Sequence, residues 1–144
     1  MSEQKFFVEV GETAEFSRTL TEADLSSFAE LSGDFDPIHM DDAYAARSRY
    51  GRRIAHGILS MALFSSVSSI ISRRAKERGS PGVSVSMGYD KIRFLEPVFI
   101  GDRLTARYTI VALEGDRSRS RVEVLNQAGD LVVVGEHIMK WLPQ

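Results

Sequence analysis

The spacing of hydrophobic residues is irregular near the start of the chain and then becomes helical. From Phe6 to Leu20 apolar and polar residues alternate loosely, and Gly11 interrupts the alternation. This pattern predicts two short strands. Between Leu25 and Leu31 the apolar residues recur at helical spacing, with Thr21 suited to the N-cap and Gly33 to the stop. The sequence therefore predicts a short amphipathic helix after the strands.

The middle of the chain combines polar, turn-prone stretches with one long helical pattern. Residues 32–37 favour a turn, 41–47 show a brief helical pattern, and 47–53 form a basic loop. From His56 to about Arg78 no helix breaker follows the early glycine, and apolar residues occur on almost every side of the first half. This predicts a helix buried most of the way round that becomes charged and exposed towards its end.

The last part of the chain alternates at the period of a strand. The alternating runs are Val83–Phe94, Leu104–Leu113, Arg119–Asn126 and Leu131–Trp141. Turn signals separate them at Pro97, Gly101–Asp102, Gly115–Asp116 and Gly129–Asp130. We expect antiparallel strands joined in sequence as a meander. The whole order indicates an α+β fold in which one long helix lies on a curled sheet.

Length and charge limit the number of domains and the kinds of partner. A chain of 144 residues fits one domain, which we place at 1–144. Its 43% hydrophobic and 26% charged content is typical of a globular protein. With 18 basic and 20 acidic residues, the net charge of −2 provides no general attraction to nucleic acid or anionic membranes. We therefore expect neither as a partner.

The composition also bears on compartment. The chain contains no cysteine, which excludes disulfides, thiolate nucleophiles and cysteine metal sites and favours the cytoplasm. The N-terminal segment has no basic flank followed by a long apolar stretch, so we expect no signal peptide. Serines interrupt the most apolar segment, around 54–71, so we expect no membrane span.

Candidate chemistry is concentrated in the segment SGDFDPIHMDDAYA. Asp34 and His39 are five positions apart, and Pro37 between them turns the backbone, so both side chains can face one cavity. A carboxylate with an imidazole is a minimal acid–base pair. Because Asp, Pro and His also occur in ordinary loops, a purely structural role is the alternative.

Three separated motifs together resemble those of one enzyme family. They are G-D-x-D-P-I-H-x-D at 33–41, R-R-I-A-H-G at 52–57 ahead of the serine-rich helix, and RFLEPVFIGDRL at 93–104. In this order, over roughly residues 15–141, the chain resembles the MaoC-like dehydratases and (R)-specific enoyl-CoA hydratases. The resemblance implies a hot-dog fold, in which an antiparallel sheet wraps a long central helix, and a homodimer.

The resemblance also implies an activity: reversible hydration of a trans-2-enoyl thioester to the (R)-3-hydroxyacyl thioester. Asp34 and His39 match the catalytic dyad, and Gly57 matches the residue whose backbone N–H binds the thioester carbonyl. The first N–H groups of a helix lack internal partners, which suits Gly57 to that role. The alternative is that Gly57 only permits tight packing. No metal or organic cofactor is implied, because coenzyme A or the phosphopantetheine of an acyl carrier protein belongs to the substrate.

Ser65, Asp36, Pro37 and His56 are further expected site residues. Ser65 lies where some family members place a serine near the reacting water; its alternative is a hydroxyl bonded to the preceding helical turn. Asp36 stands where most relatives have Asn, either as a second carboxylate in the pocket or as a turn residue. Pro37 and His56 complete the expected substrate contacts, and His56 would either orient the oxyanion donor or serve structure alone.

Two basic clusters are candidates for binding the phosphates of coenzyme A or an acidic carrier protein. The first lies in the basic loop, where Arg52 and Arg53 are the expected contacts. The second ends the long helix and contains Arg73, Arg74, Lys76 and Arg78, for which the helix dipole is a sufficient alternative explanation. The run Arg117, Arg119, Arg121 is typical of a solvated strand face. We expect His137 to be exposed or at the core edge.

Two other functions remain open at this point. A hot-dog thioesterase would direct water at the carbonyl carbon, but the position of the Asp–His pair before the long helix argues against it. A non-catalytic acyl-thioester-binding subunit of a larger complex is the other alternative. The presence of both dyad residues argues against it.

Overall fold

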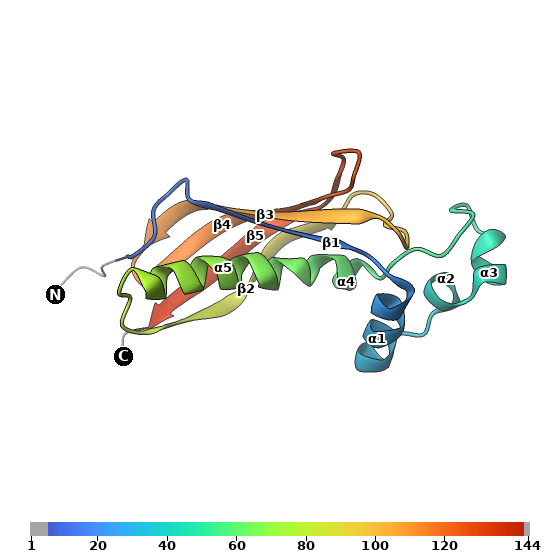
Figure 1. The fold of residues 1–144 in the computed structure, drawn as a ribbon, viewed down its shortest axis with the longest axis horizontal. Helices are drawn as coiled ribbons and strands as arrows, with labels where there is room; N and C mark the ends of the chain where they lie inside the picture. The colour runs from blue at the N-terminus through green and yellow to red at the C-terminus, as the bar shows by residue number, and fades with distance from the viewer. Residues whose placement is uncertain (1–5, 143–144) are drawn as a thin grey trace.

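Five antiparallel strands form one sheet, and a long helix lies along one face of it (Figure 1). The computed structural model describes residues 6–142, so residues 1–5, on which part of the signal-peptide expectation rests, lie outside it. The strands are β1 (Thr13–Thr19), β2 (Val83–Phe94), β3 (Arg103–Glu114), β4 (Arg117–Leu125) and β5 (Leu131–Leu142). The helices are α1 (Glu22–Ser32), α2 (Pro37–Met40), α3 (Asp42–Ala46), α4 (Gly57–Met61) and α5 (Leu63–Glu77). The α+β class and the antiparallel sheet are confirmed.

The order of strands in the sheet is β1-β3-β4-β5-β2. Strands β3, β4 and β5 form the predicted meander, but β2 pairs with β5 and not with β3. The expectation that all four late strands are joined as neighbours is therefore wrong for β2. Turn residues mark where a chain reverses but do not specify which strand it pairs with next. The crossing leaves β1 and β2 as the two edges of the described sheet.

The core lies between α5 and the inner face of the sheet. Phe64, Val67 and Ile71 recur every three or four residues on α5, and each is at most 1% exposed. They pack against alternate residues of the central strands, among them Ile110 and Val122. Burying one such side chain contributes about 1.5–3 kcal/mol. The other faces of α5 are more exposed, so the prediction of a helix buried most of the way round is wrong for this chain, because one sheet covers only one face.

The elements before the sheet differ from the predictions in three places. Residues 6–12 form bends and a turn, so the first of the two expected strands is absent from the described residues. The long helix is divided at Ala62, whose N–H lies 3.1 Å from the carbonyls of both Ile58 and Leu59 and so begins a tighter turn. The one-turn helix α2 was not predicted.

Helix α1 begins and ends as its sequence predicts. The Thr21 hydroxyl accepts the Asp24 N–H while the Asp24 carboxylate accepts the Thr21 N–H, which makes a reciprocal capping box. Gly33 ends the helix at φ 79°, a left-handed conformation that favours glycine. Across the described chain, no helix has the length and apolar character needed to cross a bilayer.

Candidate active site

The small helices α1, α2 and α3 lie beyond the N-terminal end of α4, at the opposite end of the molecule from both chain termini (Figure 1). The segment between α1 and α2 carries the expected acid–base pair. Asp36 is the N-cap of α2, and its Oδ1 accepts the Ile38 N–H at 3.0 Å, while Pro37 occupies the first helical position. Asp36 therefore acts locally as a turn residue, and the turn it starts places His39 on α2.

Asp34 and His39 face one another across a short gap. Nδ1–H of His39 donates to the Ile54 carbonyl at 2.8 Å, which leaves Nε2 directed at Asp34 Oδ2, 3.9 Å away. This separation is too long for a direct hydrogen bond but allows one water to lie about 2.8 Å from both atoms. The Asp34 side chain is 48% exposed and that of His39 only 14%. One group of the pair is thus open to solvent and the other is held in place.

His56 packs directly against this pair. Its Nε2 lies 3.0 Å from the Asp34 carbonyl oxygen, and its ring stacks on the His39 ring with centroids 4.0 Å apart. The residue is 2% exposed, and its Nδ1 is buried without a hydrogen-bond partner. His56 was expected as a substrate contact that orients the oxyanion donor or serves structure alone. It is not among the residues that line the nearby cavity, and its contacts are with Asp34 and His39 themselves.

Gly57 is the first residue of α4, so its N–H has no acceptor within the helix. A Cβ added at this position would lie 3.0 Å from the ring of Phe94. Packing against Phe94 is therefore one explanation for a glycine at position 57.

A cavity of about 290 Å³ contains His39 and Gly57. It is lined by His39, Tyr50, Ile54, Ala55, Gly57, Ser60, Phe94, Leu95, Glu96, Pro97, Val98, Val132 and Val133. The sequence reasoning identified only two of these residues as site residues. The mostly apolar remainder comes from β2, β5 and the connection after β2, and alternation along a strand does not reveal which end borders a cavity.

The other expected site residues are not among those that line this cavity: they are Asp34, Asp36, Pro37, Arg52, Arg53, His56 and Ser65. Ser65 is exposed on α5 and is not among the lining residues. Arg52 is also exposed, and its guanidinium lies 3.8 Å from the centre of the Phe99 ring. The cation–π contact holds Arg52 next to the segment that follows β2. Arg52 thus keeps a solvent-exposed cation near the cavity.

Each of the three guanidinium nitrogens of Arg53 already donates a hydrogen bond within the protein. The residue is 8% exposed, and its guanidinium donates to Asp42 at 2.7 Å and also to Glu22. A third contact, at 3.4 Å, reaches the His39 carbonyl. The pairing with Glu22 raises the pKa of Arg53 above its ordinary value. The geometry therefore assigns Arg53 to linking α1, α2 and α3, in place of the expected phosphate contact.

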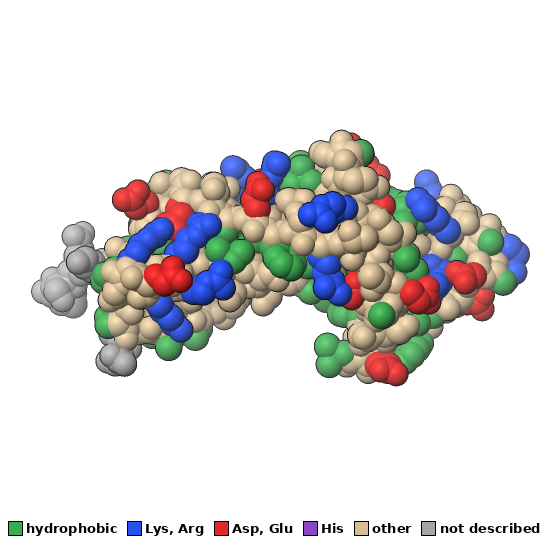
Figure 2. All heavy atoms as spheres, viewed as in Figure 1, with side chains coloured by type: hydrophobic (Ala, Val, Ile, Leu, Met, Phe, Trp, Pro, Cys, Tyr) green, Lys and Arg blue, Asp and Glu red, His purple; other side chains and the backbone are tan. Residues whose placement is uncertain are grey.

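The second basic cluster, at the end of α5, is tied to the N-terminal segment. Arg78 pairs with Glu12 at 2.7 Å and donates to the Phe7 carbonyl, while Arg74 donates to the Thr13 carbonyl at 2.6 Å. Figure 2 shows basic and acidic side chains gathered together at this end of the molecule, near the termini. The cluster lies at the opposite end from His39, so these contacts support its structural interpretation.

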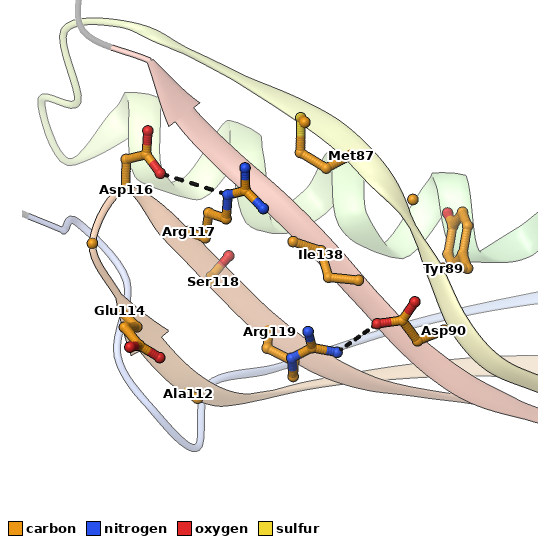
Figure 3. A pocket seen from close by; sticks show the side chains of 12 residues that line it. Met87, Tyr89, Asp90, Ala112, Glu114, Asp116, Arg117, Ser118, Arg119 and Ile138 are labelled. Carbon is orange, nitrogen blue, oxygen red and sulfur yellow. Dashed lines mark hydrogen bonds and ion pairs between the residues drawn. The ribbon is translucent and has the colours of Figure 1, made fainter.

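A second cavity, of about 720 Å³, lies on the outer face of the sheet (Figure 3). Arg119 points towards Asp90 at 3.0 Å, and Arg117 towards Asp116 at 3.8 Å. Arg119 also pairs with Glu136 at 2.7 Å. The outward arginines of β4 are thus largely neutralised, and the prediction of a solvated strand face is confirmed.

His137 lies in the core, which contradicts the expected exposed or edge position. It is 0% exposed, with Nδ1 2.7 Å from the Tyr108 hydroxyl and Nε2 2.7 Å from the Ser86 hydroxyl. Burial lowers the pKa of His137 to about 4. Burial likewise raises the pKa of Tyr108 to about 12. The residue points inward on β5, a consequence of strand register that the sequence position did not reveal.

Asp34, His39 and His56 also form a group of metal-ligand types whose ligand atoms lie within 4.8 Å of one another. The two imidazoles are stacked with 29° between their planes, so their in-plane lone pairs do not converge on one point. Nδ1 of His39 and Nε2 of His56 are already engaged with carbonyls. This arrangement suits proton transfer better than metal coordination.

Comparison with known proteins identifies clear relatives. The MaoC like domain family matches residues 6–130. An (R)-specific enoyl-CoA hydratase of Aeromonas caviae is 35% identical over 92% of this chain and 95% of its own. A 3-hydroxybutyryl-CoA dehydratase of Methylorubrum extorquens is 33% identical over 92% of this chain and 80% of its own. The solved structure of the R-hydratase PhaJ1 of Pseudomonas aeruginosa, 37% identical, superimposes with a TM-score of 0.82 over 96% of this chain and 86% of its own.

Proposed function

Because this chain belongs to the MaoC-like domain family, whose hot-dog fold it shares, we propose that it is a hydro-lyase. It adds water to a trans-2-enoyl thioester to give the (R)-3-hydroxyacyl thioester, and it catalyses the reverse dehydration. Relatives named a hydratase and a dehydratase describe the two directions of one reaction. The observation that carries the proposal is the pair Asp34 and His39, 3.9 Å apart beside the start of α4.

In this proposal the pair acts through one shared water. The hydrogen bond from Nδ1–H of His39 to Ile54 leaves Nε2 as a proton acceptor when the ring is neutral. Removing a proton from the water generates the nucleophile that attacks C3, and a proton delivered to C2 completes the addition. Dehydration uses the same groups in opposite roles.

The thioester oxygen gains negative charge as C3 is attacked, and in this proposal the Gly57 N–H donates a hydrogen bond to that oxygen. That N–H has no acceptor inside α4. A donor fixed where charge develops is worth about 3 kcal/mol in the transition state. The conjugated thioester is itself the electrophile, so the proposed reaction requires no metal or organic cofactor.

The acyl thioester belongs to coenzyme A or to an acyl carrier protein in this proposal. Relatives include enzymes named for each kind of thioester. Arg52 is the proposed phosphate contact, because it is exposed and held near the cavity by Phe99. Arg53 has a supporting role, because its guanidinium is buried and bonded to Glu22, Asp42 and the His39 carbonyl.

A homodimer is the proposed assembly. Strand β2 is an edge of the sheet, and an unpaired edge is a template for pairing with another chain. Large apolar side chains are exposed along it, among them Val83 at 52%, Met87 at 48% and Phe94 at 52%. A second copy that covers β2 would also border the cavity that contains His39. Light scattering after size exclusion tests this: a monomeric mass at micromolar concentration would contradict it.

The activity is tested by following the ultraviolet absorbance of the conjugated thioester in crotonyl-CoA. Addition of water removes the conjugation, so the proposal predicts loss of absorbance with no release of free thiol. Chiral analysis of the product should give (R)-3-hydroxybutyryl-CoA. Release of thiol would identify a thioesterase instead. If crotonyl-CoA and a longer homologue are both left unchanged by the homodimer, the proposal fails for coenzyme A thioesters.

A further inference from the structure

His56 contacts the surroundings of the candidate site on several sides. Its ring lies between Phe28 of α1 and His39 of α2, with ring centroids 4.7 Å and 4.0 Å away. The two interplanar angles are 56° and 29°, so His39 rests on one face of the imidazole and Phe28 is tilted against it. His56 therefore limits the orientations open to the His39 ring.

The same residue holds the other member of the pair by its backbone. With the proton on Nε2, His56 donates to the Asp34 carbonyl at 3.0 Å. The Asp34 carboxylate in turn accepts the Asp36 N–H at 3.1 Å, so the carbonyl and carboxylate of Asp34 are both anchored. His56 is also the N-cap of α4 and immediately precedes Gly57.

A contribution to folding stability does not explain why a histidine occupies position 56. In this tautomer Nδ1 is an acceptor, and it is buried without a hydrogen-bond partner. A buried polar atom without a hydrogen-bond partner destabilises the folded state. The imidazole ring of His56 stacks on His39, and its Nε2–H donates to Asp34.

We propose that His56 is a positioning residue for the hydration reaction, which makes the inference rest on the proposed function. It fixes the ring plane of His39 by stacking and the position of Asp34 through the carbonyl. It does not touch the substrate. A displacement of about 1 Å at a catalytic group can cost about a hundredfold in rate.

Three variants separate the two contacts. His56→Phe keeps a ring between Phe28 and His39 but has no N–H for Asp34, and His56→Gln keeps an amide N–H near Nε2 but has no ring. His56→Ala has neither. His137→Gln is the matched control, because His137 is another fully buried histidine with no contact to the pair.

The expected result with crotonyl-CoA is a fall in kcat of about a hundredfold for His56→Ala and about tenfold for each of the other two, with KM within about twofold. The control should keep its kcat per folded molecule. Because the chain has only three histidines, the ring C–H resonances of His39 can be followed by NMR at fixed pH without substrate. They should shift in His56→Gln and remain closer to wild type in His56→Phe.

Two results would overturn the proposal. One is a kcat within twofold of wild type for both His56→Phe and His56→Gln, which remain informative if His56→Ala does not fold. The other is a loss that appears only in KM or that the His137→Gln control reproduces. If the wild type is inactive, the proposed function fails on its own, and unmoved His39 resonances would still reject the positioning role.

Discussion

The environments of His137 and His39 differ in how completely the two ring nitrogens are used. His137 lies between β-strands with both nitrogens bonded to hydroxyls and no exposed surface. His39 has one nitrogen fixed by a carbonyl and the other facing a carboxylate across 3.9 Å. A histidine whose two nitrogens are satisfied in the core has no proton to exchange with a substrate. A histidine held at one nitrogen and open at the other is suited to acid–base work.

The supporting elements differ as well. His137 is positioned by the register of β5 against β2 and β4, which is set by long ladders of backbone hydrogen bonds. His39 lies on the one-turn helix α2, which cannot hold a precise orientation through its own hydrogen bonds. The short helix therefore relies on His56, Asp36 and Arg53. Side-chain contacts therefore fix the orientation of His39, whereas backbone hydrogen bonds of the sheet fix that of His137.

The largest expected effect is that of Asp34→Asn on catalysis. The amide keeps the size of the side chain but cannot accept a proton, so kcat with crotonyl-CoA should fall by about 10²–10⁴-fold. Because the Asp34 side chain is 48% exposed, the midpoint of thermal unfolding should change little. Retention of more than a tenth of the wild-type kcat would contradict the role given to Asp34.

The next effect concerns the stability contributed by the buried histidine. The folded-state pKa of His137, about 4, lies below the ordinary value of 6.5, so the unfolded chain binds the extra proton first. Its contribution is complete above pH 6.5 and is lost as the pH falls towards 4, by on the order of 3 kcal/mol. The free energy of unfolding should therefore fall over this range more steeply in wild type than in His137→Gln.

Denaturant unfolding of both proteins at several pH values between 4 and 7 measures that difference. Carboxylates titrate in both proteins, so subtracting the two free energies isolates His137. Equal pH slopes in wild type and variant would show that His137 does not titrate as its burial requires.

A smaller effect is expected from Arg53→Met. This variant tests whether side-chain contacts hold the short helix α2 in place. The change removes the links to Glu22 and Asp42 but leaves both carboxylates exposed to water, so unfolding should become easier by about 1–2 kcal/mol. Looser packing of α2 should lower kcat severalfold and raise KM by a smaller factor. A change confined to KM would instead favour the original expectation that Arg53 contacts the substrate.

The smallest effect is expected at the far end of the molecule. Replacing Arg74 and Arg78 by Ala removes their ion pairs with Glu12, and because both arginines are partly exposed the midpoint of thermal unfolding should fall only slightly. Kinetics with crotonyl-CoA should be unchanged, since the cluster is remote from His39. A large rise in KM at low salt would show that this basic end binds the substrate.

The long alternating runs and the capped helix could be predicted because each is dictated by local spacing. Strand β2 begins and ends where the alternation does, and Thr21 and Gly33 mark the ends of α1. The partner of β2 could not be predicted, because pairing with β5 depends on contacts between residues distant in sequence. The four-residue helix α2 is too short to show a periodic signal.

The candidate residues that the structure brings together come from motifs close in sequence, and the cavity-lining residues that sequence reasoning missed come from distant elements. Asp34, His39 and Gly57 come from two neighbouring segments, and the structure brings these segments together. Val132 and Val133 line the same cavity from the start of β5, and nothing in an alternating strand distinguishes them from its other buried residues. The role of Arg53 was mistaken because its partners, on α1 and α3, are recognisable only in three dimensions.

The most direct test compares His39→Gln with His137→Gln in the crotonyl-CoA absorbance assay, on material shown to be folded. The same chemical change is made in the two environments. The account predicts that His39→Gln loses about 10²–10⁴-fold in kcat while His137→Gln keeps kcat within about threefold of wild type. Equal losses in both variants, or an active His39→Gln enzyme, would contradict the claim that Asp34 and His39 carry out the chemistry.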